Sequence, residues 1–204
     1  MKKTLLFLVL VFTLCFSGVS YAEDIDSPKP IGTLTNEQGE VIEIEGILVN
    51  ETVTPLTRAS NTDMHERTYM YVVPRGVTGQ VTADDADSAS VTRAYITIYY
   101  TTTPDANGND LYLLTKVSGY WKTPTDQAWV EKAYIDYACV RIGNESQLKT
   151  DVTVSNNFSI NTGFTDGAPS WVGGTCGANL YLNLRRGTSS AWTLTVTNLL
   201  FGAL

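Results

Sequence analysis

Hydrophobic and polar residues alternate with a period of two along most of the chain, which is typical of β-strands with one buried face. In VIEIEGILV (41–49), Ile42 and Ile44 alternate with glutamates. Gly46 interrupts this alternation, as a β-bulge would. The same period predicts further strands over 67–74, 91–101, 110–119, 130–143, 149–164 (one or two strands), 178–186 and 190–200.

Turn signals separate these segments. Asn107-Gly108 suits a hairpin turn that needs positive φ, and Gly187 suits the turn of a closing hairpin. No segment of helical length shows a period of 3.6 residues. Many short strands with turns between them predict an all-β fold, an antiparallel β-sandwich of immunoglobulin-like or jelly-roll-like type rather than a barrel.

The predicted inner faces follow from the same alternation. In the segment 91–101, the residues Ala94, Ile96, Ile98 and Tyr100 share one face. Because residues at i and i+2 of a strand point to the same side, we expect these four side chains to lie in the core.

Residues 1–22 form a separate segment. Lysines precede an apolar stretch over 4–16, which is too short to span a bilayer comfortably. Ser20 and Ala22 are small residues at the −3 and −1 positions of a cleavage site. This pattern is typical of a secretory signal peptide, so we predict a secreted mature chain that begins at Glu23.

The rest of the chain divides into a leader and a domain. Residues 23–40 are polar and acidic and contain Pro28 and Pro30, a composition that predicts a flexible leader. Residues 41–204 are enough for one domain with a sizeable core, and we predict a single β-sandwich domain there.

The charge of the chain limits its partners. It has 14 Lys and Arg against 21 Asp and Glu, and a net charge of −7 that falls to −9 when the two lysines of the signal segment are lost. Such a charge repels phosphate backbones and anionic membranes, which argues against nucleic-acid binding. No second apolar stretch reaches transmembrane length, so we expect no stable membrane insertion after signal cleavage.

Two cysteines, Cys139 and Cys176, lie outside the signal segment. The segment GGTCGA around Cys176 partly matches the G-x-S-x-G nucleophile elbow, but a strand follows it rather than a helix. A cysteine nucleophile also needs a base, and the chain has a single histidine, His65, predicted in a loop before a strand. Export favours a Cys139–Cys176 disulfide between the 130–143 strand and the loop before the closing hairpin, while a Cys176–His65 pair stays open as the alternative.

Metal ligands are sparse in the sequence. Asp63, His65 and Glu66 do not complete a zinc site at ligand spacing. The acidic stretch Asp84–Asp87 and the PDANGND segment (104–110) have some features of calcium loops, but neither carries a full ligand pattern. We therefore predict no metal and no cofactor, and the sequence leaves calcium binding by Asp84–Asp87 open.

The aromatic residues point to binding rather than catalysis. The segment SGYWKTPTDQAW lies between two predicted strands and carries Tyr120, Trp121 and Trp129. Flat aromatic faces are typical platforms for sugar rings, and the alternative is that these rings cap the ends of the core. No catalytic residues stand out, so we predict a non-catalytic binding protein with a carbohydrate or another surface protein as its ligand.

The alternative function is a small secreted hydrolase with an unrecognised carboxylate site. A concave groove with two suitably spaced acids would favour the enzyme. A strip of aromatic residues on an otherwise polar sheet face would favour binding.

The run "YLLTKVSGYW … NFSINTGF … GGTCGANLYLNLRRGTSSAWTLTVTNLLF", within roughly residues 111–201, resembles uncharacterised small secreted bacterial β-rich proteins. The resemblance implies export and a β fold. It implies no site residues.

Overall fold

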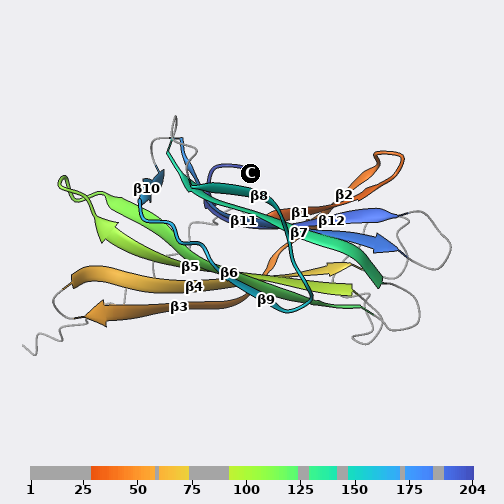
Figure 1. Cartoon of the computed structure of the whole chain (residues 1–204), viewed down its shortest axis with the longest axis horizontal. Coiled ribbons are helices and arrows are strands. Elements are labelled where there is room, and N and C mark those ends of the chain that lie inside the picture. The colour runs from red at the N-terminus through yellow and green to blue at the C-terminus, as the bar shows by residue number, and fades with distance from the viewer. Residues whose placement is uncertain are drawn as a thin grey trace, which may run out of the picture.

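The computed structural model describes residues 29–57, 60–73, 92–123, 129–141, 147–170, 173–185 and 191–204. Within these residues, twelve strands form two antiparallel sheets that pack against each other (Figure 1). The strands are β1 (Ile31–Asn36), β2 (Val41–Glu45), β3 (Ile47–Thr57), β4 (Ser60–Val73), β5 (Thr92–Pro104), β6 (Asp110–Lys122), β7 (Trp129–Val140), β8 (Leu148–Thr153), β9 (Phe158–Asn161), β10 (Ala168–Pro169), β11 (Thr175–Arg185) and β12 (Trp192–Phe201).

The first sheet, sheet A, has the strand order β2-β1-β12-β11-β7-β8. The second, sheet B, has the order β10-β6-β5-β4-β3, and β9 also pairs with β6. The sheets remain open and do not close into a barrel, so the predicted β-sandwich is confirmed.

The core lies between the two sheets and follows the predicted alternation. Ala94, Ile96 and Ile98 of β5 are fully buried, and so are Leu180 and Leu182 of β11 on the opposite sheet. Burying a large aliphatic side chain contributes roughly 1.5–3 kcal/mol to folding. The buried side chains on the inner faces of the long strands therefore contribute much of the free energy that holds the two sheets together.

The predicted flexible leader is wrong for residues 31–36, because these residues form β1. This strand lies between β2 and β12, and Leu34 lies opposite Leu194 in the core with 2% of its surface exposed. The alternation that marks this strand is short: Gly32 and Leu34 point inward, and Thr33 and Thr35 point outward. The predicted start of the domain at residue 41 therefore shifts toward the N-terminus, while residues 1–28, with the predicted cleavage site, lie outside the described residues.

Gly46 marks a crossing between the sheets rather than the predicted bulge within one strand. The strand before it, β2, belongs to sheet A, and the strand after it, β3, belongs to sheet B. A Cβ atom at Gly46 would come within 2.8 Å of the Tyr71 ring. A larger residue would therefore push apart the two layers where the chain passes between them.

The hairpin turn predicted at Asn107-Gly108 is confirmed. Gly108 has a φ of +83°, and the turn connects β5 to β6. The Asp105 carboxylate accepts hydrogen bonds from the backbone N–H groups of Asn107 (2.8 Å) and Asn109 (2.9 Å). These bonds, chiefly those with Asn109, lower the pKa of Asp105. Its carboxylate is therefore engaged in building the turn.

Candidate functional site

The three aromatic residues predicted to bind a ligand do not share one surface. Tyr120 lies on the outer face of sheet B and is 36% exposed. Trp129 is the first residue of β7 in sheet A, opposite Arg185, and is 46% exposed. Trp121 is only 8% exposed and belongs to the core.

The prediction of Trp121 as a ligand-binding residue does not fit this burial, which arises because β6 continues beyond Gly119 to Lys122. Alternation along the strand places Trp121 on the inner face and Tyr120 on the outer face. The Trp121 backbone N–H also donates a hydrogen bond to Asn156 Oδ1 at 3.1 Å. A ligand at this segment would meet Tyr120 and not Trp121.

The outer face of sheet B carries a row of large apolar side chains that crosses four strands. We call it the aromatic row. Its members face one another across neighbouring strands: Ile47 (β3), Met70 (β4), Tyr95 (β5) and Tyr120 (β6). The rings of Tyr95 and Tyr120 stack, with centroids 4.2 Å apart and an interplanar angle of 11°. Cross-strand aromatic pairs of this kind stabilise a sheet face and present a rigid surface.

A second row lies beside the aromatic row and consists of small polar side chains. This hydroxyl row contains Asn50, Thr68, Thr97, Ser118 and Ser159, in β3, β4, β5, β6 and β9. Thr68 Oγ1 and Thr97 Oγ1 are hydrogen-bonded at 2.8 Å. Thr68 and Thr97 keep 9% and 8% of their surface exposed, so this part of the row is open to a ligand only in part.

A third row, the charged row, flanks the hydroxyl row on its other side. Its members are Thr52, Glu66, Tyr99, Lys116 and Asn161. The Lys116 ammonium lies 4.5 Å from the centroid of the Tyr99 ring, within the range of a cation–π contact. Glu66 Oε1 accepts a hydrogen bond from Asn50 Nδ2 at 3.3 Å. The charges of this row are therefore engaged by its own neighbours.

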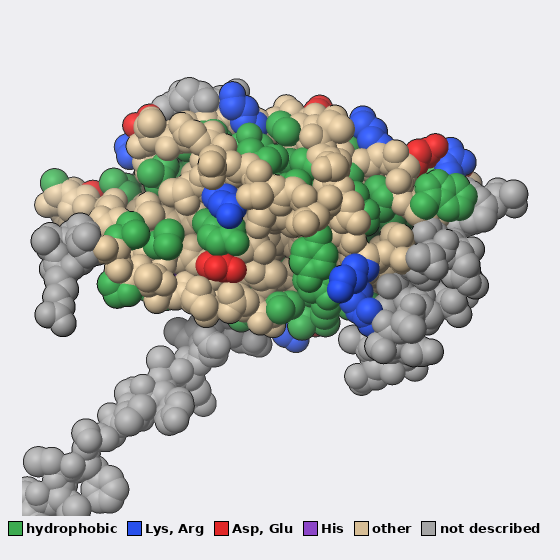
Figure 2. Space-filling view, turned by 60° about the horizontal axis from the view of Figure 1, so that its bottom comes forward, with side chains coloured by type: hydrophobic (Ala, Val, Ile, Leu, Met, Phe, Trp, Pro, Cys, Tyr) green, Lys and Arg blue, Asp and Glu red, His purple; other side chains and the backbone are tan. Residues whose placement is uncertain are grey.

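The three rows together form a banded surface. Same-face residues of one strand are about 6.7 Å apart, so the aromatic and charged rows lie about 13 Å apart, with the hydroxyl row between them. Neighbouring strands are about 4.8 Å apart, so the hydroxyl row offers polar groups at about that repeat. Figure 2 shows this face, with hydrophobic side chains in green beside charged side chains in blue and red.

The outer face of sheet A has a comparable ring pair but a different surrounding. Tyr134 and Tyr181 stack with centroids 4.7 Å apart. Residues near the C-terminus bond to the neighbouring part of β11: Thr175 Oγ1 donates to Ala203 O at 2.9 Å, and Asn179 Nδ2 donates to Leu204 O at 3.3 Å. Part of this face is therefore engaged within the chain itself.

The geometry of the cysteines does not support a nucleophile. Cys176 lies within β11 and not in a loop, and its thiol donates a hydrogen bond to the Cys139 sulfur at 3.1 Å. That bond, together with burial, raises the pKa of Cys176 well above its ordinary value. Both thiols are free in this structure.

His65 lies within β4 and not in the predicted loop. Its ring stacks on Tyr100 with centroids 4.6 Å apart, and its Nε2 is 2.9 Å from Thr102 Oγ1. These contacts place His65 against the neighbouring strand β5. There it packs on Tyr100 and does not act as a base for a cysteine thiol.

Metal ligands do not cluster in the part of the chain that the structure describes: no three His, Cys, Asp or Glu side chains lie close enough together to hold an ion. The acidic stretch Asp84–Asp87 lies outside the described residues. Calcium binding at that stretch therefore stays open.

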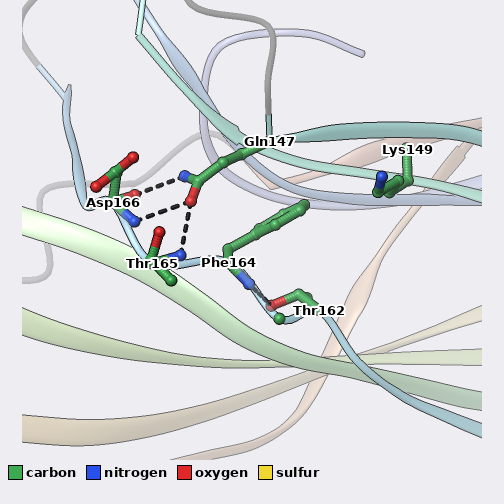
Figure 3. A pocket seen from close by; sticks show the side chains of 7 residues that line it. Gln147, Lys149, Thr162, Phe164, Thr165 and Asp166 are labelled. Atoms are coloured by element: carbon green, nitrogen blue, oxygen red, sulfur yellow. Dashed lines mark hydrogen bonds between the residues drawn. The ribbon is translucent and has the colours of Figure 1, made fainter.

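A polar pocket of about 280 Å³ lies between the start of β8 and the loop after β9 (Figure 3). The Gln147 side chain forms one wall. Its Oε1 accepts the backbone N–H groups of Thr165 and Asp166, and its Nε2 donates to Cys139 O and Asp166 O, all at 2.7–2.8 Å. The amide is thus fully satisfied and fixes the loop to β7.

This pocket has little catalytic chemistry among its lining residues. Asp166 is the one carboxylate that lines it, beside Lys149 and Thr162. Glycoside hydrolysis needs two carboxyl groups that flank the scissile bond. The pocket therefore does not provide the acid pair that would favour the hydrolase alternative.

No family model, curated protein or solved structure matches the chain. Within the described ranges, no helix is long and apolar enough to cross a membrane. The resemblance to small secreted bacterial proteins therefore stays a prediction.

Proposed function

We propose that this chain is an exported, non-catalytic protein that binds a neutral carbohydrate chain on the outer face of sheet B. The observation that supports this most is the hydroxyl row with the aromatic row along one side and Tyr99 along the other. Three tyrosines, Tyr95, Tyr120 and Tyr99, thus border small polar side chains on one sheet face, and such a combination favours binding.

The hydroxyl row suits a polymer of repeated hydroxyl groups. A threonine or serine hydroxyl both donates and accepts hydrogen bonds, and an asparagine amide does the same with separate atoms. Within the Thr68–Thr97 pair, one hydroxyl donates to the other, so one O–H group still has its donor capacity. A sugar chain that lies across the strands would meet such groups on successive strands.

The tyrosines supply the apolar part of the contact. One face of the Tyr120 ring stacks on Tyr95, and the 36% exposure of Tyr120 leaves ring surface open to solvent. Sugar rings have apolar faces of C–H groups that pack on such surfaces, while polar groups set their orientation. The aromatic row would thus hold the ring faces and the hydroxyl row would bond to the ring edges.

The charges favour a neutral ligand over a charged one. Lys116 contacts the Tyr99 ring, and Glu66 accepts a bond from Asn50, so an ionic ligand would have to displace these contacts. The net charge of −7 also repels polyanions.

The same rows argue for binding rather than hydrolysis. Among the described residues that make up the three rows, Glu66 is the single carboxylate. A glycosidase needs an acid and a second carboxylate on opposite sides of the bond. A sugar held here would have one carboxylate near it and no partner for that group within the rows.

The test is an array of neutral linear glycans probed with the mature chain, followed by titration of the best binder. Tyr120→Ala should weaken binding by roughly 5–150-fold, as loss of an anchor side chain does. Tyr134→Ala is the matched control, because it removes one ring of the equivalent stack on sheet A and should leave the affinity unchanged.

Two results would contradict the proposal. Equal loss in Tyr134→Ala and Tyr120→Ala would show that the affinity does not depend on the outer face of sheet B. Capture of a protein partner through Tyr120, with no glycan bound on the array, would keep the surface but reject the ligand class.

A further inference from the structure

Cys139 and Cys176 are placed for a covalent bond. They are direct partners in the antiparallel pairing of β7 with β11, so their side chains point to the same side of sheet A. Directly opposed residues of such a pair have Cα atoms about 4.5–5.5 Å apart, which lies within the range that a disulfide spans. The sulfur atoms are 3.1 Å apart, and small side-chain rotations would bring them to bonding distance.

The pairing has no competitor within the chain. Its third cysteine, Cys15, lies in the predicted signal segment. If that segment is removed on export, Cys139 and Cys176 can pair only with each other or with another molecule. In the folded chain, burial blocks pairing with another molecule, because the two residues are 1% and 0% exposed.

We infer that the exported protein carries a disulfide between Cys139 and Cys176 that links the adjacent strands β7 and β11 within sheet A. The sequence alone predicted a bond from a strand to a loop. The register instead makes it a link between two neighbouring strands in the interior of the sheet, between β12 on one side and β8 on the other.

The chemistry requires an external oxidant, and we assign that role to a disulfide-bearing protein oxidant of the export compartment. The two thiols lose two protons and two electrons as the S–S bond forms, and the disulfide of the oxidant is reduced to two thiols. A mixed disulfide is the intermediate, so one thiol must first be accessible.

Burial determines when this reaction can occur. In the folded chain, Cys139 Sγ lies 3.0 Å from the Tyr112 carbonyl oxygen of β6, so sheet B covers the pair. The oxidant cannot reach sulfur atoms in that position. Oxidation must therefore precede the packing of sheet B on sheet A, after which the bond is shielded from reductants.

The bond would close a long loop. The cysteines are 37 positions apart, and the intervening chain contains β8, β9 and β10. In the chain-entropy model a loop of this length stabilises the fold substantially, and for a domain of this size we expect a rise in Tm of roughly 8–16 °C.

The test uses the full mature chain, purified after export without reductant. The protein is unfolded in guanidinium, treated with iodoacetamide and weighed intact. We expect no alkylation, a mass about 2 Da below that of the dithiol, and alkylation of both cysteines once reductant is added to the unfolded chain. Two alkylated thiols without reductant would overturn the inference, and so would a disulfide-linked dimer.

The variant Cys176→Ala provides a second, independent test. In Cys176→Ala, Cys139 has no partner and should take one alkyl group without reductant. Prior reduction in guanidinium, followed by refolding, should lower the Tm of the unchanged protein by the expected amount and leave that of Cys176→Ala unaltered. An equal response of both proteins would show that the cysteines do not form this bond.

Discussion

Asn198 of β12 and Arg67 of β4 hold each other across the two sheets by reciprocal hydrogen bonds. Asn198 Nδ2 donates to the Arg67 carbonyl oxygen at 2.9 Å, and Arg67 Nε donates to Asn198 Oδ1 at 3.1 Å. Asn198 Nδ2 also donates to Ile96 O at 3.1 Å, and Arg67 Nη2 donates to Leu199 O at 2.6 Å. Asn198 is fully buried, so this group fixes how sheet A is aligned on sheet B.

Loss of the Asn198 side chain should be costly because the groups that it bonds would lose these bonds. We predict that Asn198→Ala lowers the free energy of unfolding by roughly 2–4 kcal/mol, since a half-buried charged donor and two carbonyls lose their partner. The control is Asn183→Ala on the outer face of sheet A, whose side chain accepts a single bond from Thr193. Urea unfolding of both variants measures the difference, and similar losses would show that the inter-sheet contact contributes no more than a surface bond.

Trp121 and Trp129 should respond in opposite ways to truncation. Trp121 is 8% exposed and Trp129 is 46% exposed. Trp121→Ala should lower the free energy of unfolding by roughly 3–5 kcal/mol, as loss of a core aromatic residue does. Trp129→Ala should change it by about 0.5 kcal/mol or less. Thermal and urea unfolding test both values, and a stable Trp121→Ala protein would argue against the position of Trp121 in the core.

The error over Trp121 shows what strand periodicity can and cannot reveal. The inner face of β5, from Ala94 to Tyr100, is confirmed because alternation alone determines it. At the end of β6, Gly119 looked like the end of the strand. In the structure Gly119 is an inner-face position, where an added Cβ would lie 2.9 Å from the ring of Phe158. A side chain from a segment distant in sequence takes the place of the missing one, and this cannot be read locally.

The candidate site depends on relationships of the same kind. The tyrosines and threonines of β4, β5 and β6 are visible in the sequence, but the rows exist only because the register places Thr68, Thr97 and Ser118 side by side. Register between strands is set by the packing of both sheets and by bulges such as the one between Tyr99 and Tyr100. Tyr120 was identified from its aromatic neighbourhood, whereas Tyr95 was missed because its alternation with buried residues was read only for the core.

The strand β1 should contribute to stability like any core strand. We predict that Leu34→Ala lowers the free energy of unfolding by roughly 2–5 kcal/mol, because Leu34 is 2% exposed. Thr35→Ala, on the opposite face of the same strand, should cost far less. Denaturant unfolding compares the two variants, and a negligible effect of Leu34→Ala would restore the interpretation of this segment as a leader.

Alkaline pH should destabilise the fold through two buried phenols. Burial raises the pKa of Tyr100 to about 12 and raises that of Tyr71 further. In the unfolded chain both groups lose their protons near pH 10, so above that pH the folded state keeps protons that the unfolded state has lost. The free energy of unfolding is thus unaffected below about pH 10 and falls toward pH 12, by up to about 1.4 kcal/mol per pH unit for each phenol.

Urea unfolding between pH 9 and 12 measures this slope. Tyr100→Phe removes one of the two ionising hydroxyls and keeps the ring on which His65 stacks, so it should make the slope shallower. An unchanged slope in Tyr100→Phe would mean that the Tyr100 phenol ionises alike in the folded and unfolded chain.

The proposed binding surface predicts a role for the hydroxyl row that can be separated from folding. Thr68 and Thr97 bond to each other through their hydroxyls, so replacing both by valine removes donor and acceptor together and leaves no unpaired partner. Such a paired replacement by groups of the same shape is nearly neutral for stability.

We predict that the double variant Thr68→Val/Thr97→Val keeps its Tm within a few degrees but binds the best glycan of the array roughly 10-fold or more weakly, because buried bonds to the ligand are lost. The control is Thr193→Val/Thr195→Val on the outer face of sheet A, which should retain full affinity. Titration calorimetry of the three proteins decides the matter: undiminished binding by the Thr68→Val/Thr97→Val protein would remove the hydroxyl row from the site and leave only the tyrosines as ligand contacts.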